Sequence, residues 1–246
     1  MKNKASGGIA ETIKTLVYAV VIAVFIRTFF YEPFNIPSGS MIPTLLVGDY
    51  LFVSKFSYGY SRYSMFGIPL FSGRIFFTPP RRGDVAVFKL PRDPSVDYIK
   101  RVIGLPGDHI QVKEGILYIN DKPVKLERTD ECNDPDDPRS ASYQRYWETL
   151  PNGVRHCIIL RAEGKGEVEN TGVFVVAPNS YFMMGDNRDN SADSRVADSG
   201  VGNVPAENLV GRAEFLFFST NGYAHWWEVW NWPFTIRYDR LFKAIH

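Results

Sequence analysis

The chain has 246 residues, 45% of them hydrophobic, with 28 basic and 27 acidic side chains, which gives a net charge of +1. That length allows a substantial core in one large or two small domains, and the balanced charge argues against a nucleic-acid partner. The two cysteines form no CxxC pattern and no HExxH stretch is present, so we expect no metal site, no redox motif and no cofactor.

The first predicted element is a membrane anchor over residues 13–31, preceded by a tail over residues 1–12. Residues 16–26 (LVYAVVIAVFI) are unbroken apolar, and an aromatic stretch at 29–31 extends the run. No small-x-small cleavage site follows, which favours a retained transmembrane helix over a removed signal peptide. Lys2, Lys4 and Lys14 precede the run, so we expect a single pass with the tail in the cytoplasm and the rest outside.

The stretch over residues 37–45 (PSGSMIPTL) presents one serine in a stiffened turn. Ser40 lies between Pro37 and Pro43, which prevents the segment from continuing a long helix or a central strand. The string alone also fits a plain Ser/Gly/Pro linker between an anchor and a soluble domain. Whether Ser40 is a nucleophile therefore depends on a base elsewhere in the chain.

The body of the chain reads as strands separated by turns rich in glycine and proline, which predicts an all-β architecture. Strand-like runs occupy residues 49–56, 85–88, 97–103, 109–112, 116–119, 154–160, 172–177 and 209–219. Over 97–103, the period of two places Tyr98, Lys100 and Val102 on one face of the strand. Lys100 is thus a lysine with apolar neighbours, although a solvated face would show the same pattern.

Two polar segments lie further along the chain. Residues 129–147 are acidic but lack the glycine and ligand spacing of a calcium loop, so we expect a solvated surface loop. Residues 185–195 (GDNRDNSADSR) follow an apolar run and carry charges that can pair within the loop, such as Asp193 with Arg195 or Asp189 with Arg188. This predicts a rigid, self-bonded loop that supports a site, with a plain exposed loop as the alternative.

A catalytic serine needs a group that takes its proton and donors that stabilise the oxyanion. The four histidines lie in no recognisable triad signature, and neither a Gly-x-Ser-x-Gly nor a Ser-x-x-Lys motif is present. A lysine can replace histidine when burial lowers its pKa, because desolvation disfavours the ammonium form. Lys100 is the best candidate for such a base.

Four segments, in order, resemble the motif boxes of bacterial type I signal peptidases. They are YEPFNIPSGSMIPTLLVGD, GDVAVFKLP, DYIKRVIGLPGD and MGDNRDNSADSR, and they fall within residues 31–108 and 178–217. The resemblance implies a Ser–Lys serine endopeptidase of the bacterial inner (cytoplasmic) membrane that removes signal peptides from exported preproteins. Its partners would be those preproteins and the lipid bilayer, without nucleic acid or metal.

The resemblance also implies roles for the matched residues nearest the chemistry. Ser40 would be the nucleophile and Lys100 the general base. The backbone N–H of Ser40 and the hydroxyl of Ser38 would form the oxyanion hole, and Ser191 would orient the Lys100 amine.

Other matched residues would support the site or bind substrate. Asp193 and Arg195 would pair and brace the loop that carries Ser191. The walls of the pocket for small substrate residues would include Phe34, Ile36, Pro37 and Tyr98.

The implied fold is mostly β, as in signal peptidases and self-cleaving repressors. An N-terminal transmembrane helix precedes an antiparallel β catalytic domain (residues 32–108 and 177–246), with a second β domain (109–176) inserted into it. A self-cleaving repressor would need an N-terminal DNA-binding domain, where this chain has its apolar run. A conjugation-type processing peptidase and a catalytically inactive membrane-anchored interaction domain remain as alternatives.

Two further features leave a choice open. Cys132 and Cys157 both fall in the expected insert, where they are either free thiols or a disulfide. Near the C-terminus, a tryptophan-rich segment either docks on the membrane or packs as an aromatic cluster against the body. Its aromatic residues are Trp226, Trp227, Trp230, Trp232 and Phe234.

Overall fold

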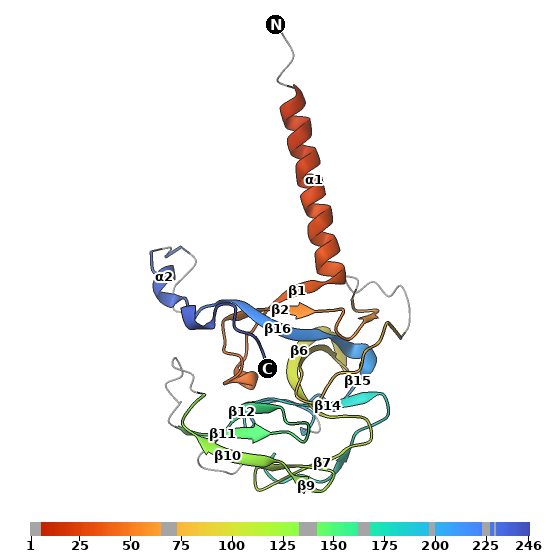
Figure 1. Cartoon of the computed structure of the whole chain (residues 1–246), viewed down its shortest axis with the longest axis vertical. Helices are drawn as coiled ribbons and strands as arrows, with labels where there is room; N and C mark the ends of the chain where they lie inside the picture. Colours follow the sequence, from red (N-terminus) through yellow and green to blue (C-terminus); the bar gives the residue numbers. More distant parts are fainter. Residues whose placement is uncertain are drawn as a thin grey trace.

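The computed structural model describes residues 6–64, 73–132, 142–161, 168–196, 200–222, 227–228 and 230–246. Helix α1 (Ser6–Phe29) projects away from a β body (Figure 1), and its apolar stretch Gly8–Phe29 is exposed except near its C-terminal end, where Thr28 is buried. The length and the mean hydropathy of 2.0 of this stretch fit a membrane span. Tyr31, which we placed at the end of the anchor, is instead the first residue of β1 and pairs with Ser54.

The largest sheet is antiparallel and has seven strands in the order β1-β2-β16-β5-β6-β14-β15. Its strands are β1 (Tyr31–Asn35), β2 (Asp49–Ser54), β5 (Val85–Leu90), β6 (Asp93–Gly104), β14 (Ser180–Met184), β15 (Asn203–Pro205) and β16 (Leu209–Ser219). The serine turn connects β1 to β2, so one edge of this sheet carries Ser40.

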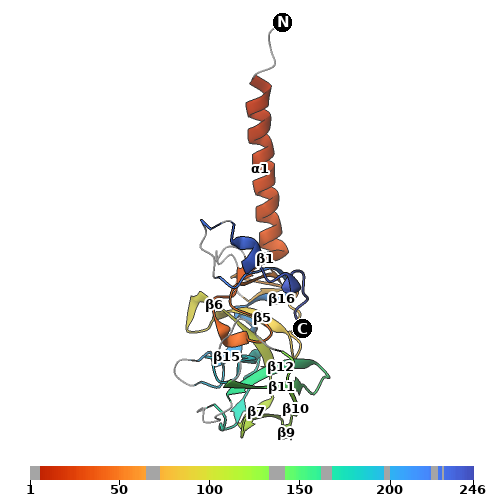
Figure 2. The ribbon, with the colours of Figure 1, turned by 90° about the vertical axis from the view of Figure 1, so that its left-hand side faces the viewer.

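The expected insert, residues 109–176, forms two smaller sheets of its own. One has the order β13-β7-β8-β9, and the other β10-β11-β12. Their strands are β7 (His109–Lys113), β8 (Ile116–Ile119), β9 (Lys122–Pro123), β10 (Lys125–Thr129), β11 (Tyr143–Thr149), β12 (Arg155–Arg161) and β13 (Phe174–Val175). Figure 2 shows these strands at the end of the body opposite α1. The division into two domains stays a prediction.

One sequence expectation within the insert is wrong. We expected a solvated loop over residues 129–147, but Tyr143–Thr149 is the central strand of the β10-β11-β12 sheet, and residues 133–141 lie outside the described residues. Its sequence (YQRYWET) mixes polar and charged residues with three aromatic ones, and Glu148 is buried with 1% of its surface exposed. The buried position of Glu148 is occupied by a charged residue whose partner is distant in the sequence, so this strand lacks the apolar pattern by which buried strands are recognised.

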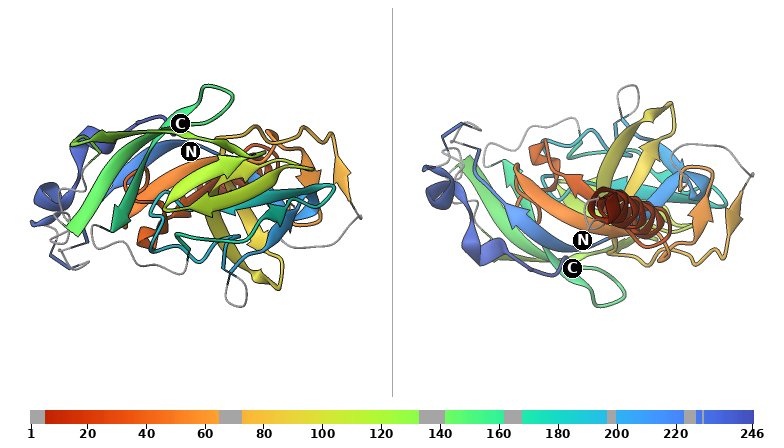
Figure 3. Two further views of the ribbon diagram at one scale, coloured as in Figure 1. Left: turned by 90° about the horizontal axis from the view of Figure 1, so that it is seen from below. Right: turned by 90° about the horizontal axis from the view of Figure 1, so that it is seen from above.

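The short elements lie at the ends of the body. The hairpin of β3 (Tyr60–Ser61) and β4 (Arg74–Ile75) is at one end, and α2 (Trp232–Thr235) is at the other. Seen from above (Figure 3), α1 stands between them. The short 3-10 helices are η1 (Gly39–Met41), η3 (Ala206–Asn208) and η4 (Tyr238–Arg240).

The predicted alternation along β6 is confirmed. Val102 and Tyr98 pack in one apolar cluster with Phe88, whereas Ile99 and Ile103 pack in clusters on the opposite side of the strand. The strand therefore carries the Lys100 side chain on the face of Tyr98 and Val102, as the sequence indicates. This placement brings Lys100 into the interior instead of leaving it in solvent.

Candidate active site

The serine turn is held in place by the distant loop 185–195. Ser40 lies in the single turn of η1, and only 8% of its surface is exposed. The backbone N–H of Asn187 donates to the Ser40 carbonyl (3.1 Å), and the Asn187 side-chain amide donates to the Gly39 carbonyl (3.0 Å). Asn187 was not among our candidate residues, and its two bonds fix the backbone on both sides of the serine hydroxyl.

Lys100 meets this serine directly. Its Nζ lies 2.6 Å from the Oγ of Ser40 and 3.0 Å from the carbonyl oxygen of Ile99. The ammonium position is also 5.3 Å from the centre of the Tyr98 ring. Only 3% of Lys100 is exposed, so the alternative of a solvated lysine does not describe this structure.

The surroundings of Lys100 favour its neutral form. Burial lowers the pKa of Lys100 to about 8, although the carboxylates of Asp193 and Asp186 oppose that shift. Near pH 7, about a tenth of the amine is therefore unprotonated. A neutral amine at this distance can accept the hydroxyl proton of Ser40 and so activate it as a nucleophile.

A cleft of about 540 Å³ opens over this pair, between β1, the serine turn, β6 and the loop 185–195. All four residues that we expected in the pocket walls line it: Phe34, Ile36, Pro37 and Tyr98. Ser38, which we expected in the oxyanion hole, lines it as well. The sequence did not point to Asn190 and Ala192, which line it from the loop side. The Ser38 hydroxyl forms no hydrogen bond within the described part of the chain, and its expected role in the oxyanion hole stays a prediction.

The loop 185–195 is buried at its two ends, with Asp186, Arg188 and Asp193 each exposed by no more than 2%. Arg195 pairs with Asp193 at 2.8 Å and also donates to the carbonyl of Arg188. Burial alone would raise the pKa of Asp193, but Arg195 outweighs it and lowers that pKa. The polar sequence thus encodes an internally braced support and not an exposed loop.

Ser191 lies beside this brace. Its buried Oγ lies near enough to Asp193 to help lower the pKa of that carboxyl, yet it meets the geometry of no hydrogen bond among the described residues. Its expected role in orienting Lys100 stays a prediction. Gly185 is needed here because a Cβ would lie 2.3 Å from Ser191 Oγ and 2.4 Å from the Ser40 carbonyl oxygen.

The suggested pairing of Asp189 with Arg188 is not formed. Arg188 instead makes two bonds to the carboxylate of Glu148, at 2.9 and 2.5 Å, while Asp189 accepts a bond from the backbone of Arg161. Both partners come from the expected insert, so its β11 and β12 contact the loop that supports Ser40. A pairing between residues 40 positions apart leaves no local signal in the sequence.

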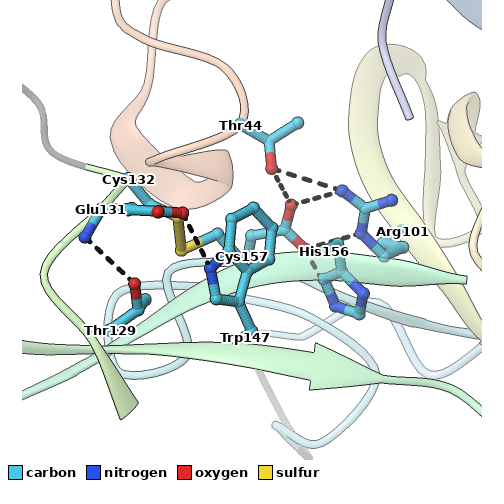
Figure 4. Close-up of a disulfide and its surroundings, with 9 residues drawn as sticks. Thr44, Arg101, Thr129, Glu131, Cys132, Trp147, His156 and Cys157 are labelled. Atoms are coloured by element: carbon cyan, nitrogen blue, oxygen red, sulfur yellow. Dashed lines mark hydrogen bonds and ion pairs between the residues drawn. A yellow bond between two sulfur atoms is a disulfide. The ribbon is translucent and has the colours of Figure 1, made fainter. Parts of the chain in front are cut away.

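A second buried ion pair lies next to Thr44, at the end of the serine turn. Arg101 pairs with Asp186 at 2.7 Å, and the Thr44 hydroxyl donates to the same carboxylate at 2.5 Å. The His156 Nε2 lies 3.2 Å from Glu148 and 3.8 Å from Asp186, and burial lowers the pKa of His156. Figure 4 shows Thr44, Arg101 and His156 converging from separate segments. This histidine belongs to the support of the turn.

The two cysteines form a disulfide, which resolves the choice that the sequence left open. Cys132 and Cys157 are joined across 25 positions, with their Cα atoms 6.3 Å apart (Figure 4). Cys157 lies opposite Trp147 in the pairing of β11 with β12, next to His156. The described residues contain no group of three His, Cys, Asp or Glu side chains that could hold a metal ion.

Comparison with known proteins gives strong matches. The model of the family described as "Signal peptidase, peptidase S26" matches residues 9–218. Signal peptidase I of Rickettsia typhi (strain ATCC VR-144 / Wilmington) is 42% identical, over 99% of this chain and 97% of its own. Signal peptidase I of Rickettsia canadensis (strain McKiel) is 43% identical, over 100% and 97%. A crystal structure of a signal peptidase I from Enterococcus faecalis V583 is 24% identical, over 55% of this chain and 97% of that one, and its TM-score of 0.32 is too low to carry an argument.

Proposed function

This chain belongs to the signal peptidase family, peptidase S26, and we propose that Ser40 and Lys100 carry out its reaction. It is a serine endopeptidase that removes signal peptides, and α1 anchors it in a membrane. The observation that carries the assignment of roles is the 2.6 Å contact between Ser40 Oγ and the buried amine of Lys100. The preproteins that bear signal peptides are its substrates.

The proposed reaction begins when Ser40 Oγ attacks the scissile carbonyl carbon and its proton passes to Lys100 Nζ. The Ser40 N–H and the Ser38 hydroxyl donate to the developing oxyanion. The C–N bond then breaks as Lys100 returns the proton to the leaving amine, which frees the mature protein and leaves the signal peptide as an ester. Lys100 next takes a proton from water, whose oxygen attacks the ester carbonyl carbon. The ester C–O bond then breaks as Lys100 returns that proton to Ser40 Oγ, which releases the signal peptide with a free carboxyl end.

Substrate choice should follow from the cleft beside Ser40 and Lys100. We expect small residues at the first and third positions before the cut, because a branched side chain there would clash with the walls formed by Phe34 and Ile36. The full-length enzyme should therefore cut a precursor once, directly after an A-x-A sequence. Sequencing the N-terminus of the released protein identifies the bond that was cut. Leucine directly before the cut should slow cleavage by about a hundredfold.

The same assay separates this proposal from its alternatives. A catalytically inactive interaction domain would leave every precursor intact. A conjugation-type processing peptidase would leave general signal-bearing precursors intact while cutting a dedicated substrate. Equal cleavage of the alanine and leucine precursors would contradict the proposed pocket.

We also propose the inner membrane of a bacterium as the location, with residues 1–12 in the cytoplasm and the catalytic body outside. The lysines before α1 support that orientation. Because the substrate's signal helix would lie in the same membrane, anchoring raises the effective concentration of the scissile bond at the cleft.

The body itself should touch the bilayer through its tryptophan-rich segment. Trp230, Trp232 and Phe234 are exposed by 66%, 47% and 84%. Helix α2, which carries the last two, lies near the level where α1 leaves the body (Figure 1). Trp226 lies outside the described residues. We expect a form without residues 1–30 to bind phospholipid vesicles, and replacing both Trp230 and Phe234 by serine to weaken binding by about tenfold.

Vesicle sedimentation measures this binding, and tryptophan fluorescence follows the insertion. Val175→Ser is the matched control, because Val175 is also exposed (57%) but lies in the insert at the opposite end. Failure of the shortened protein to bind, or equal binding by the double variant, would contradict docking through this segment.

A further inference from the structure

The anchor passes into the catalytic sheet without a linker. Helix α1 ends at Phe29 and β1 begins at Tyr31, so Phe30 alone separates them. The Phe30 N–H donates to the Ile26 carbonyl (2.8 Å), and the Phe30 carbonyl accepts from the Lys55 N–H (2.9 Å). Both backbone groups of the connecting residue are therefore bonded, one to the helix and one to the body.

Side chains from the body fasten the same junction. The Tyr60 hydroxyl donates to the Phe29 carbonyl (2.7 Å), which would otherwise be an unpaired group at the end of the helix. The Glu32 carboxylate bridges Arg27 on the helix and Lys55 on the body, at 2.9 Å each. The Lys55 side chain is only 4% exposed and also donates to the Ser64 carbonyl. These bonds resist bending between helix and sheet.

The strand that begins at this junction also leads straight to the nucleophile. Tyr31 to Asn35 pair in register with β2, and Ser40 follows Tyr31 by nine positions. A chain of that length spans at most about 30 Å, and its paired part cannot stretch or fold up. The distance of Ser40 from the end of the membrane helix is thus fixed by the fold.

We propose that the junction of Glu32, Lys55 and Tyr60 sets the shortest spacer that the enzyme accepts between the apolar helix of a signal peptide and the scissile bond. This inference rests on the proposed function. If the spacer is too short to reach from the membrane to Ser40, the effective concentration of the scissile bond at the cleft is almost zero. If the spacer is longer than needed, that effective concentration falls only gradually. The enzyme therefore discriminates sharply against short spacers and weakly against long ones.

The test uses full-length enzyme in phospholipid vesicles and synthetic precursors that differ only in spacer length, one residue at a time. A soluble peptide with the same cleavage sequence but no apolar helix reports on the cleft alone. In the wild type, shortening the spacer by one residue below the shortest accepted length should slow precursor cleavage by about tenfold or more. Two changes loosen the junction: a Gly-Ser-Gly-Ser insertion between Phe30 and Tyr31, and the double variant Tyr60→Phe with Glu32→Gln.

Both loosened enzymes should accept spacers shorter by about two residues, because a flexible hinge lets the cleft tilt towards the bilayer. They should cleave the soluble peptide within about twofold of the wild type, which also shows that they fold. Glu127→Gln is the matched control: Glu127 pairs with Lys125 at the exposed surface of the insert, and this change should leave the limit in place.

Three other outcomes would overturn the inference, and the third is distinguishable from the first two. A wild type that cleaves the precursors without a lower limit, or an insertion variant with normal peptide cleavage and an unmoved limit, would refute the role of the junction while leaving the proposed function intact. A wild type that cleaves neither precursor nor peptide would refute the proposed function, and the inference with it.

Discussion

Replacing Lys100 by arginine is expected to abolish turnover while leaving the chain folded. The substitution retains a positive charge and much of the side-chain length, but a guanidinium stays protonated at any usable pH and cannot take the Ser40 proton. We expect kcat to fall by about a thousandfold or more, close to the level left by Ser40→Ala. Single-turnover cleavage of a precursor in detergent measures both variants, and a circular dichroism spectrum checks that each is folded.

The pH dependence of the wild type provides an independent test of the same base. The amine acts only when unprotonated, so kcat/KM should be low at acid pH, rise as pH passes about 8 and level off above it. Ser40→Ala and Lys100→Arg should show no such rise. A folded Lys100→Arg enzyme that cleaves within about tenfold of the wild type would rule out the Ser–Lys pair.

The contact between Ser40 and Lys100 was predictable because both residues obey local rules. The flanking prolines shape the turn that presents Ser40, and the period of two along β6 gives the face on which Lys100 lies. The pair of Asp193 with Arg195 is also local, since the two residues are neighbours in one loop. What the sequence could not supply was the distance between the turn and the strand, which depends on the pairing of β5 with β6 and of β1 with β2.

The ion pairs that support the serine turn were not predictable, because their partners lie far apart in the sequence. Arg188 has an acidic neighbour at Asp189, so a local pairing was the natural expectation, yet it pairs with Glu148 from the insert. The register of β11 with β12 sets Glu148 opposite His156 and directs both towards the loop. The available hints were that Glu148 directly follows the aromatic residues Tyr146 and Trp147, and that His156 lies beside the apolar run of β12.

This contact between the insert and the loop gives the second large expected effect. Glu148→Gln should destabilise the chain by about 3 kcal/mol near pH 7, because it leaves the buried guanidinium of Arg188 without a counter-charge. Glu127→Gln, on the neighbouring strand β10, removes an exposed pairing and should leave the unfolding midpoint close to that of the wild type. The midpoints of denaturant unfolding of the two variants and the wild type, in the same detergent, give both differences.

The effect of Glu148→Gln should also depend on pH in a definite direction. Burial alone would raise the pKa of Glu148, but Arg188 and His156 outweigh it and lower that pKa well below its usual range. A carboxyl with a lowered folded-state pKa stabilises fully above its unfolded pKa, about 4.3, and loses that contribution as pH falls towards the folded value. The stability gap between wild type and Glu148→Gln should therefore be constant from neutral pH down to about pH 5 and shrink below that. A gap that stays unchanged to acid pH would mean that packing, and not the charge pair with Arg188, accounts for the loss.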